Sequence, residues 1–408
     1  MRILCFYTLA LVSVASTCSP GPLIPDQHEV QGYIQRRAGL ASATPTSKTG
    51  LRNVHIFNGH TFRPGWLAMQ GGKITFDLHN VDSWIDGQDG YLIPGLIDSH
   101  CHPASISDLA TLSSYGVTTA ISMGCPSYPL CASLRDQPGL PSFFTASAGI
   151  VGPNSTHALV MHADPDTLIR SASQAPQFVS WAFGNNSDFI KIITETNGPD
   201  QATQDAIVSE THRLGRQAMT HAADIRSYLR AIASGTDGIQ HTPGDGNITP
   251  AMIEDMRRNG QFIVPITMVV KAFLNSAVLP LSSYNKRSWQ TVIGNLKSMH
   301  RARLPLLVGT DAVSLNDPFA ALVKNPLGST MHDELEVFVN EVGFEPAEAL
   351  RAATSLPARL FRLADRGLIM EGKRADLLLL ASNPLKNISA TRGIMKVWNG
   401  GIEYNSAA

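Results

Sequence analysis

The chain has 408 residues, a formal net charge of -1 and only 16% charged residues. A chain of this length can bury a large core, either as one barrel with additions or as two to three ordinary domains. Because positive and negative charges nearly cancel, the composition argues against a nucleic-acid-binding protein and against one that binds an anionic membrane surface.

The first residues are typical of a secretory signal peptide. Arg2 supplies the positive charge, residues 3–14 form an apolar stretch, and small residues that suit cleavage follow. An uncleaved membrane anchor is the alternative, but roughly a dozen apolar residues are short for a bilayer span of about 20. We therefore predict a signal peptide over residues 1–18, a secreted mature protein without a membrane segment, and a linker or arm over residues 19–48, which are rich in Pro, Ser, Thr and Gly.

In a secreted protein, the sequons can be glycosylated and the cysteines can form disulfides. The candidate glycosylation sites of the Asn-x-Ser/Thr type begin at Asn154, Asn185, Asn247 and Asn387. Cys125 and Cys131 flank a short loop that an oxidising compartment would close with a disulfide. Cys101 alternates on its predicted strand to the side opposite His100 and His102, so we expect a packed thiol.

Short strand-like runs separated by Gly and Asn turns occupy residues 49–93, and similar runs return in residues 365–405. Two all-β pieces of this size are too small to fold alone. We predict that they share one small β-sandwich domain.

Residues 94–364 have a different pattern, in which short apolar runs alternate with amphipathic helical stretches. This alternation predicts an α/β fold with parallel strands, and eight such strands favour a closed (β/α)8 TIM-like barrel over an open doubly wound sheet. The predicted strands are 92–100, 117–123, 143–148, 189–194, 217–221, 238–241, 262–267 and 304–311. The predicted helices are 166–181, 200–214, 225–233, 249–259, 288–302, 333–342 and 346–363.

Polar residues stand at the carboxyl ends of several predicted strands, the rim where barrel active sites form. They are His100, His221, His241 and Asp311, with His102 just past the first strand. The period of two along a strand sends the imidazoles of His100 and His102 to one side, where they can bind one metal ion together. A single histidine at a strand end is commonly a satisfied or solvated residue, but five such positions argue against coincidence.

Lys191 lies in the middle of the apolar run 188–194. A lysine buried in a strand costs several kcal/mol unless something neutralises or occupies its amine. An outward-pointing lysine on a strand edge is the alternative. Together with the strand-end residues, Lys191 indicates a two-metal site.

These residues resemble the signatures of the metal-dependent amidohydrolase superfamily, over roughly residues 50–405. Segments similar to its strand signatures are 93–103 for the first strand, 189–192 for the carboxylated-lysine strand, 220–222 and 239–241 for the fifth and sixth, and 309–312 for the eighth. The tail over residues 348–385 resembles the branch that contains imidazolonepropionase-like enzymes, Xaa-Pro dipeptidases and ochratoxinase.

The resemblance implies two divalent metal ions held around a modified lysine. His100, His102 and Asp311 would bind the first metal, and His221 and His241 the second. Lys191, after addition of carbon dioxide to its amine, would bridge the two metals as a carbamate. Zinc suits imidazole and carboxylate ligands best, with manganese or iron as alternatives.

A hydroxide shared by two cations attacks a polarised carbonyl, and Asp311 would accept its proton and pass it to the leaving atom. For Asp311 the alternative role is a helix cap. We expect a secreted binuclear amidohydrolase that cleaves the amide bond of a small-molecule substrate, such as an N-acyl amino acid or a dipeptide. The alternatives are a lactone or ester hydrolase acting on a secondary metabolite, and a non-catalytic metal-binding homologue. A homo-oligomer is compatible with each.

The chain departs from the family pattern in places that bear on the substrate. After the third strand, relatives often have a Gly-Gly-His run, whereas residues 149–154 lack a histidine and His157 follows only later. Gln240 stands where Glu is usual before the sixth-strand histidine. Candidate pocket groups in the rim loops are His157, His162, Tyr284 and His332, although a solvated surface position explains each of them equally well.

Overall fold

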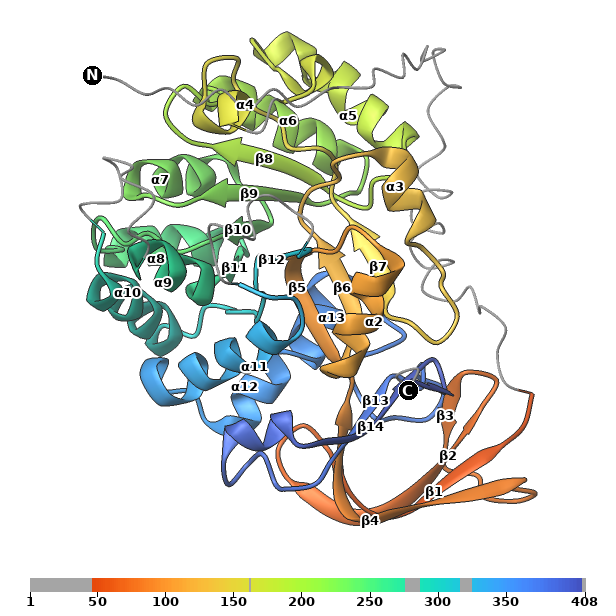
Figure 1. Cartoon of the computed structure of the whole chain (residues 1–408). Coiled ribbons are helices and arrows are strands. Elements are labelled where there is room, and N and C mark those ends of the chain that lie inside the picture. The colour runs from red at the N-terminus through yellow and green to blue at the C-terminus, as the bar shows by residue number, and fades with distance from the viewer. Residues whose placement is uncertain (1–45, 161–162, 276–286, 316–324, 406–408) are drawn as a thin grey trace, which may run out of the picture.

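The computed structural model describes residues 46–160, 163–275, 287–315 and 325–405 (Figure 1). The predicted signal peptide, nearly all of the predicted arm, His162 and Tyr284 lie outside the described residues. In Figure 1 a curved sheet lies at one end of the molecule, and a larger part built of strands and helices lies at the other.

The curved sheet has seven strands in the order β15-β14-β13-β4-β1-β2-β3. Its strands are β1 Thr49–Phe57, β2 Phe62–Gln70, β3 Lys73–Thr75, β4 Ser83–Pro94, β13 Leu377–Leu380, β14 Ile394–Asn399 and β15 Ile402–Glu403. Antiparallel pairing of β13 with β4 joins the late part of the chain to the early part, with Leu378 opposite Ile93. Leu51, Leu67 and Trp398 pack in the core of this sheet. The bounds of the two domains and a sandwich arrangement stay predictions.

The larger part contains two four-stranded parallel sheets, β11-β10-β9-β8 and β12-β5-β6-β7. Their strands are β5 Leu96–His102, β6 Val117–Ser122, β7 Ser142–Thr145, β8 Ile190–Thr194, β9 Ala218–Ala222, β10 Gly238–Gln240, β11 Phe262–Val264 and β12 Ala312–Val313. Nearly every residue of these strands is buried, as expected of parallel strands covered on both faces.

Backbone contacts link the two parallel sheets at both edges. On one side Ala146 bridges Phe189, between β7 and β8. On the other side Ile263 in β11 bridges Leu306, and Ser99 in β5 donates a hydrogen bond to the carbonyl of Val308. These contacts arrange the strands in the order of a TIM-barrel-like fold, whereas a fully closed eight-stranded barrel stays a prediction.

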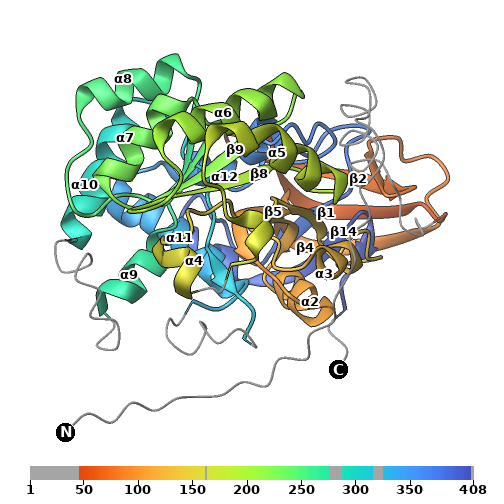
Figure 2. The same cartoon turned by 90° about the horizontal axis from the view of Figure 1, so that it is seen from above.

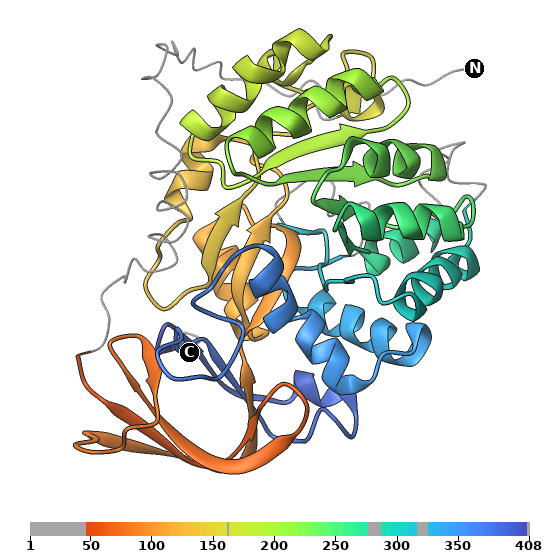
Figure 3. The same ribbon diagram turned by 180° about the vertical axis from the view of Figure 1, so that it is seen from behind.

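Helices lie on the outer side of the parallel strands, which Figures 2 and 3 show from above and from behind. The α-helices are α2 Ile106–Ser114, α3 Tyr128–Ser133, α4 Thr156–Val160, α5 Ala175–Gly184, α6 Gln201–Arg213, α7 Ile225–Ser234, α8 Pro250–Arg258, α9 Thr267–Asn275, α10 Trp289–Arg301, α11 Ser329–Glu336, α12 Pro346–Ala352 and α13 Ser355–Leu360. Side chains cap several of them: Asp200 accepts a hydrogen bond from the backbone of Thr203, and Asp224 accepts one from Ser227. The first turns of these helices are therefore fixed by local sequence.

Two predicted strands were wrong in their course, and two others, 143–148 and 262–267, end three residues early, at Thr145 and Val264. The predicted strand 92–100 is two strands, because the chain leaves the curved sheet at Pro94, opposite Leu377, and enters the barrel at Leu96, opposite Val117. Of the predicted strand 304–311 none is assigned as strand, and the short β12 begins at Ala312.

Several predicted helices also differ from the structure. The first part of the predicted helix 166–181 contains two short 3-10 turns, and the α-helix itself, α5, begins only at Ala175. The predicted helix 333–342 begins earlier, at Ser329, and ends in a π-helical turn. The predicted helix 346–363 is interrupted between α12 and α13. The helices α2, α3, α4 and α9 were not predicted.

The structure contains the predicted disulfide between Cys125 and Cys131. Cys101 is fully buried in the core and unpaired, so the prediction of a packed thiol is confirmed. Within the described ranges, no helix combines the length and apolar character needed to traverse a bilayer.

Candidate metal centre

Three predicted ligands come together at the rim of β5. The Nε2 atoms of His100 and His102 lie 3.2 Å apart, because both side chains leave β5 on the same side. Oδ1 of Asp311 lies 3.2 Å from Nε2 of His100 and 3.0 Å from Nε2 of His102. One potential ligand atom from each residue lies within 4.8 Å of the others, which is the arrangement of a candidate metal site.

Asp311 reaches this position through a tight turn rather than at the end of a strand. Its φ of 53° is in the left-handed region, and its backbone N–H donates to the carbonyl of His100 at 2.6 Å. A Cβ added at Gly309 would lie 2.9 Å from the backbone nitrogen of His100, so glycine lets the turn pass this close to β5.

Asp98 stabilises the same turn through hydrogen bonds, a role that was not predicted from the sequence. Its carboxylate accepts hydrogen bonds from Oγ1 of Thr310 at 2.7 Å and from the backbone N–H of Thr310 and of His100, both at 3.1 Å. Burial raises the pKa of Asp98 to about 7 although these hydrogen bonds favour the charged form. Only its position within a strand predicted to be buried could have pointed to such a role.

The second imidazole nitrogen of His100 is also engaged. Nδ1 lies 2.8 Å from Oε1 of Gln240, the last residue of β10. Because an amide oxygen only accepts, the proton of the neutral imidazole lies on Nδ1, and Nε2 keeps a lone pair for a metal ion.

His221 and His241 lie beside this cluster. His221 is in β9 and His241 follows β10, and their rings pack edge to face with centroids 4.3 Å apart. The ring of His241 is 5.6 Å from that of His100. Burial, as the largest cause, lowers the pKa of both imidazoles well below the usual value. Both are therefore neutral, the form that binds metal.

Lys191 is buried in β8 with 3% of its surface exposed. Burial lowers the pKa of its amine to about 8. Its charge further lowers the pKa of His100, His221 and His241, whose main shift comes from burial. Lys191 therefore acts electrostatically on three of the predicted imidazole ligands.

His157, predicted as a pocket group, approaches the same imidazoles. Its ring is 4.7 Å from that of His221. Its Nδ1 lies 2.9 Å from Oε2 of Glu195, and its backbone N–H donates to Oε1 of Glu195 at 2.8 Å. Burial would raise the pKa of Glu195, but the hydrogen bonds and charge of His157 outweigh it and the pKa is lowered. Glu195 was missed, although it follows β8 at the same rim as the other polar residues.

His332 does not belong to the rim, and its prediction as a pocket group was wrong. It is fully buried in α11, where Nδ1 lies 3.0 Å from Oγ1 of Thr391 and Nε2 lies 3.1 Å from the carbonyl oxygen of Tyr115. Both ring nitrogens are engaged by partners distant in sequence, so His332 has a structural role.

The sequence matches the model of the amidohydrolase family over residues 91–402. It is 25% identical over 379 residues to an adenine deaminase of Gluconobacter oxydans, covering 86% of this chain and 58% of the relative. It is 27% identical over 200 residues to ochratoxinase of Aspergillus niger, covering 48% and 39%. In each case the match spans less than two thirds of the curated relative.

Solved structures show the same fold. A structure described as a Xaa-Pro dipeptidase with bound methionine in the active site aligns with a TM-score of 0.75 and 22% identity, over 88% of this chain and 100% of the other. The structure of A. niger ochratoxinase aligns with a TM-score of 0.73 and 18% identity, over 88% and 96%. These neighbours support a TIM-barrel-like fold with an additional sheet domain.

Proposed function

The chain belongs to the amidohydrolase family, and we propose that it is a metal-dependent hydrolase that cleaves a carbon–nitrogen bond in a small-molecule amide. The observation that carries this proposal is the convergence of His100, His102 and Asp311 within 4.8 Å. Imidazole and carboxylate in such a group are the donors that zinc prefers.

The donor set fits a binuclear centre. His100, His102 and Asp311 would hold one divalent cation, and the neutral imidazoles of His221 and His241 would hold a second. Lys191 would bridge them as a carbamate. Burial lowers the pKa of its amine to about 8 and so favours the neutral form, which is the form that reacts with carbon dioxide. The neutral amine adds to carbon dioxide and loses a proton, which leaves a carbamate anion with two oxygens.

Cations held by these ligands would bring the pKa of bound water towards neutrality and polarise a carbonyl oxygen. Asp311 would accept the proton of the attacking water and deliver it to the leaving nitrogen. Burial alone would raise the pKa of Asp311, but His100 and His102 hold it well below the usual range. Asp311 is therefore ionised and able to take up that proton.

The amide of an amino acid is the substrate class that the neighbours support. A structural neighbour is described as a dipeptidase with bound methionine, and ochratoxinase is both a sequence relative and a structural neighbour. N-acyl amino acids and dipeptides are thus the first candidates. Secretion and glycosylation at the predicted sequons are also part of the proposal.

A hydrolysis screen tests the function. The zinc-loaded protein is assayed with aromatic N-acyl amino acids, Xaa-Pro dipeptides and lactones, beside the variants Asp311→Asn and Asp333→Asn. Asp333 lies in α11, pairs with Arg392 and serves as the matched surface control. Amide cleavage that D311N loses and D333N keeps supports the proposal. Cleavage of lactones alone favours the alternative, and no turnover at full metal loading contradicts catalysis.

A further inference from the structure

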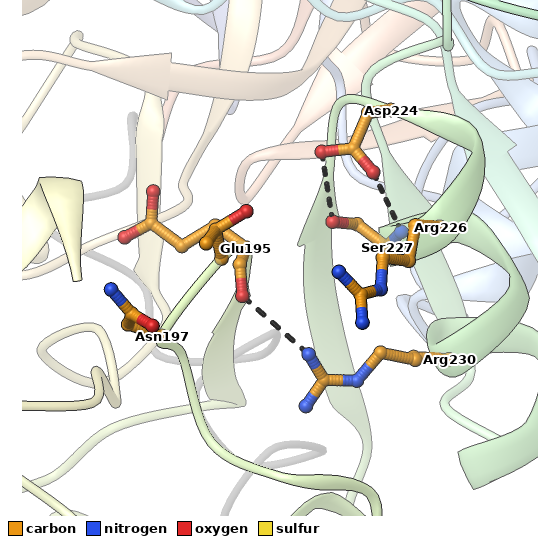
Figure 4. A pocket seen from close by; sticks show the side chains of 7 residues that line it. Glu195, Asn197, Asp224, Arg226, Ser227 and Arg230 are labelled. Carbon is orange, nitrogen blue, oxygen red and sulfur yellow. Dashed lines mark hydrogen bonds between the residues drawn. The ribbon is translucent and has the colours of Figure 1, made fainter. Parts of the chain in front are cut away.

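A small cavity of about 160 Å³ lies beside the metal centre, between the loop after β8 and the first turns of α7. Figure 4 shows the side chains that line it. They are Glu195, Thr196, Asn197, Asp224, Arg226, Ser227 and Arg230. Glu195 is the link to the centre, since its carboxylate contacts His157 and the ring of His157 packs against that of His221.

Two guanidinium groups share this cavity. Arg226 and Arg230 are four residues apart on α7, so they project from the same face of the helix. Like charges at this spacing repel each other. Burial lowers the pKa of Arg230, and the charge of Arg226 lowers it further. Two positive charges that repel each other therefore lie close together at one point of the rim.

The nearby carboxylates do not pair with these cations. Asp224 accepts hydrogen bonds from the backbone and the hydroxyl of Ser227, and Asp200 accepts one from Thr203, because both aspartates cap helices. The carboxylate of Glu195 contacts the imidazole of His157, and in Figure 4 it points away from Arg230. Asp200 and Asp224 still attract Arg230 electrostatically, but neither forms an ion pair with it.

Backbone carbonyls hold Arg230 in place instead. Its guanidinium donates to the carbonyl oxygen of Pro199 and, at 3.5 Å, to that of Glu195. These contacts fix the plane of the group and leave other N–H donors available. Within the part of the chain that the structure describes, the guanidinium of Arg226 has no hydrogen-bond or ion-pair partner.

We propose that this cavity binds a carboxylate group, held between Arg226 and the fixed guanidinium of Arg230. A planar carboxylate matches the paired donors of a guanidinium and would relieve the repulsion between the two cations. Glu195 and His157 connect the cavity to His221, one of the predicted metal ligands. The carboxylate therefore belongs either to the far end of an extended amide substrate or to a separate small molecule; the first source rests on the proposed function.

Direct binding tests the site without any turnover. Glutarate and its neutral analogue glutaramide are titrated into the zinc-loaded protein by calorimetry. We expect glutarate to bind and glutaramide not to bind, Arg226→Met to weaken the binding of glutarate about tenfold, and Arg226→Lys to recover part of it. Arg63→Met, at an exposed position of β2, is the control. If glutarate binds only at the metals, its affinity will not change in R226M. That result, or no binding of glutarate at all, overturns the proposal.

Kinetics separate the two sources of the carboxylate. N-glutaryl-L-phenylalanine and N-pentanoyl-L-phenylalanine differ in one terminal carboxylate. A rise in KM for the glutaryl substrate alone in R226M, with kcat unchanged, identifies the group as part of the substrate. Equal behaviour of both substrates, with glutarate binding retained in the wild type, identifies a separate ligand. If neither amide is cleaved while R226M still loses glutarate, the proposed function fails and the site stands.

Discussion

Nδ1 of His100 and Oε1 of Gln240 lie 2.8 Å apart, and this contact orients the imidazole towards Asp311. The other polar atom of the Gln240 side chain, Nε2, is buried and has no hydrogen-bond partner among the described residues. The position therefore orients a ligand but leaves one donor unsatisfied.

Changes at Gln240 should alter metal affinity in opposite directions. Gln240→Leu removes the acceptor that fixes the tautomer of His100, and we expect about 10–100-fold weaker zinc binding. Gln240→Glu removes the unsatisfied donor and adds a charge that makes the imidazole a stronger ligand, so we expect tighter binding. Competition with a chelator measures both. Equal affinity in all three proteins would show that His100 does not bind the metal.

Lys191→Met should have opposite effects in the two states of the protein: loss of function in the metal-loaded form and higher stability in the metal-free form. In the zinc-supplemented protein we expect loss of one metal and of activity, because the bridge is missing. In the metal-free protein at pH 7 we expect higher stability than the wild type. Burial lowers the pKa of Lys191 from 10.5 to about 8, so its unfavourable effect is present below pH 8 and fades towards 10.5.

Metal counting and urea unfolding on both sides of pH 8 check these expectations. Growth and assay without carbon dioxide and bicarbonate give a further control, since only a carbamate bridge requires them. A K191M protein that keeps two metals and full turnover would remove Lys191 from the centre.

The disulfide between Cys125 and Cys131 closes a loop beside the metal ligands. A Cβ at Gly124 would lie 3.6 Å from Cε1 of His102, so this segment forms one wall of the site. Closing so short a loop removes about 2 kcal/mol of chain entropy from the unfolded state. We expect Cys125→Ser with Cys131→Ser to lower the free energy of unfolding by about that amount.

Urea unfolding with and without reductant measures this effect. Reductant should bring the wild type to the stability of the double variant and leave the variant unchanged. A difference that persists in reductant would mean that packing of the two side chains, and not the covalent link, is responsible.

Local periodicity was enough to predict the parts of the site that lie on regular strands. His100 and His102 share one side because they are two residues apart, and Cys101 between them is buried on the other. Asp311 was predicted from its place at the end of an apolar run and from its resemblance to a family motif. Its backbone was not, because the turn depends on contacts with His100 and on Asp98, which holds Thr310 across a separation of 212 residues.

Contacts between distant segments explain the remaining errors. His332 was predicted to lie at the rim, but its partners Thr391 and Tyr115 are 59 and 217 residues away in the sequence. The pair of His157 and Glu195 joins two loops that no periodicity connects. Such tertiary hydrogen bonds carry no local sequence signal.

Glu334 is a buried carboxylate that has no cationic partner among the residues the structure describes. It lies in α11 with no exposed surface, and it accepts hydrogen bonds of 2.7 Å from Oγ1 of Thr267 and from the backbone N–H of Met268. Burial outweighs these hydrogen bonds and raises the pKa of Glu334 from 4.5 to about 8. The folded state therefore retains a proton at neutral pH that the unfolded state releases.

This difference makes stability depend on pH in a known direction. The contribution of Glu334 is fully present below about pH 4.5 and is lost as the pH rises through 8, because the unfolded state binds fewer protons in that range. Glu334→Gln cannot ionise, and its amide can still accept from Met268 and donate to the hydroxyl of Thr267. We expect E334Q to match the wild type at pH 5 and to exceed it at pH 9.

Urea unfolding of the metal-free proteins measures this, so that metal ligands do not contribute. Glu254→Gln, on the exposed side of α8, is the matched control and should change little at either pH. If E334Q is instead less stable than the wild type at pH 9, the two hydrogen bonds keep Glu334 ionised in the folded state. In that case Glu334 acts as an anionic cap of α9, and burial does not decide its protonation.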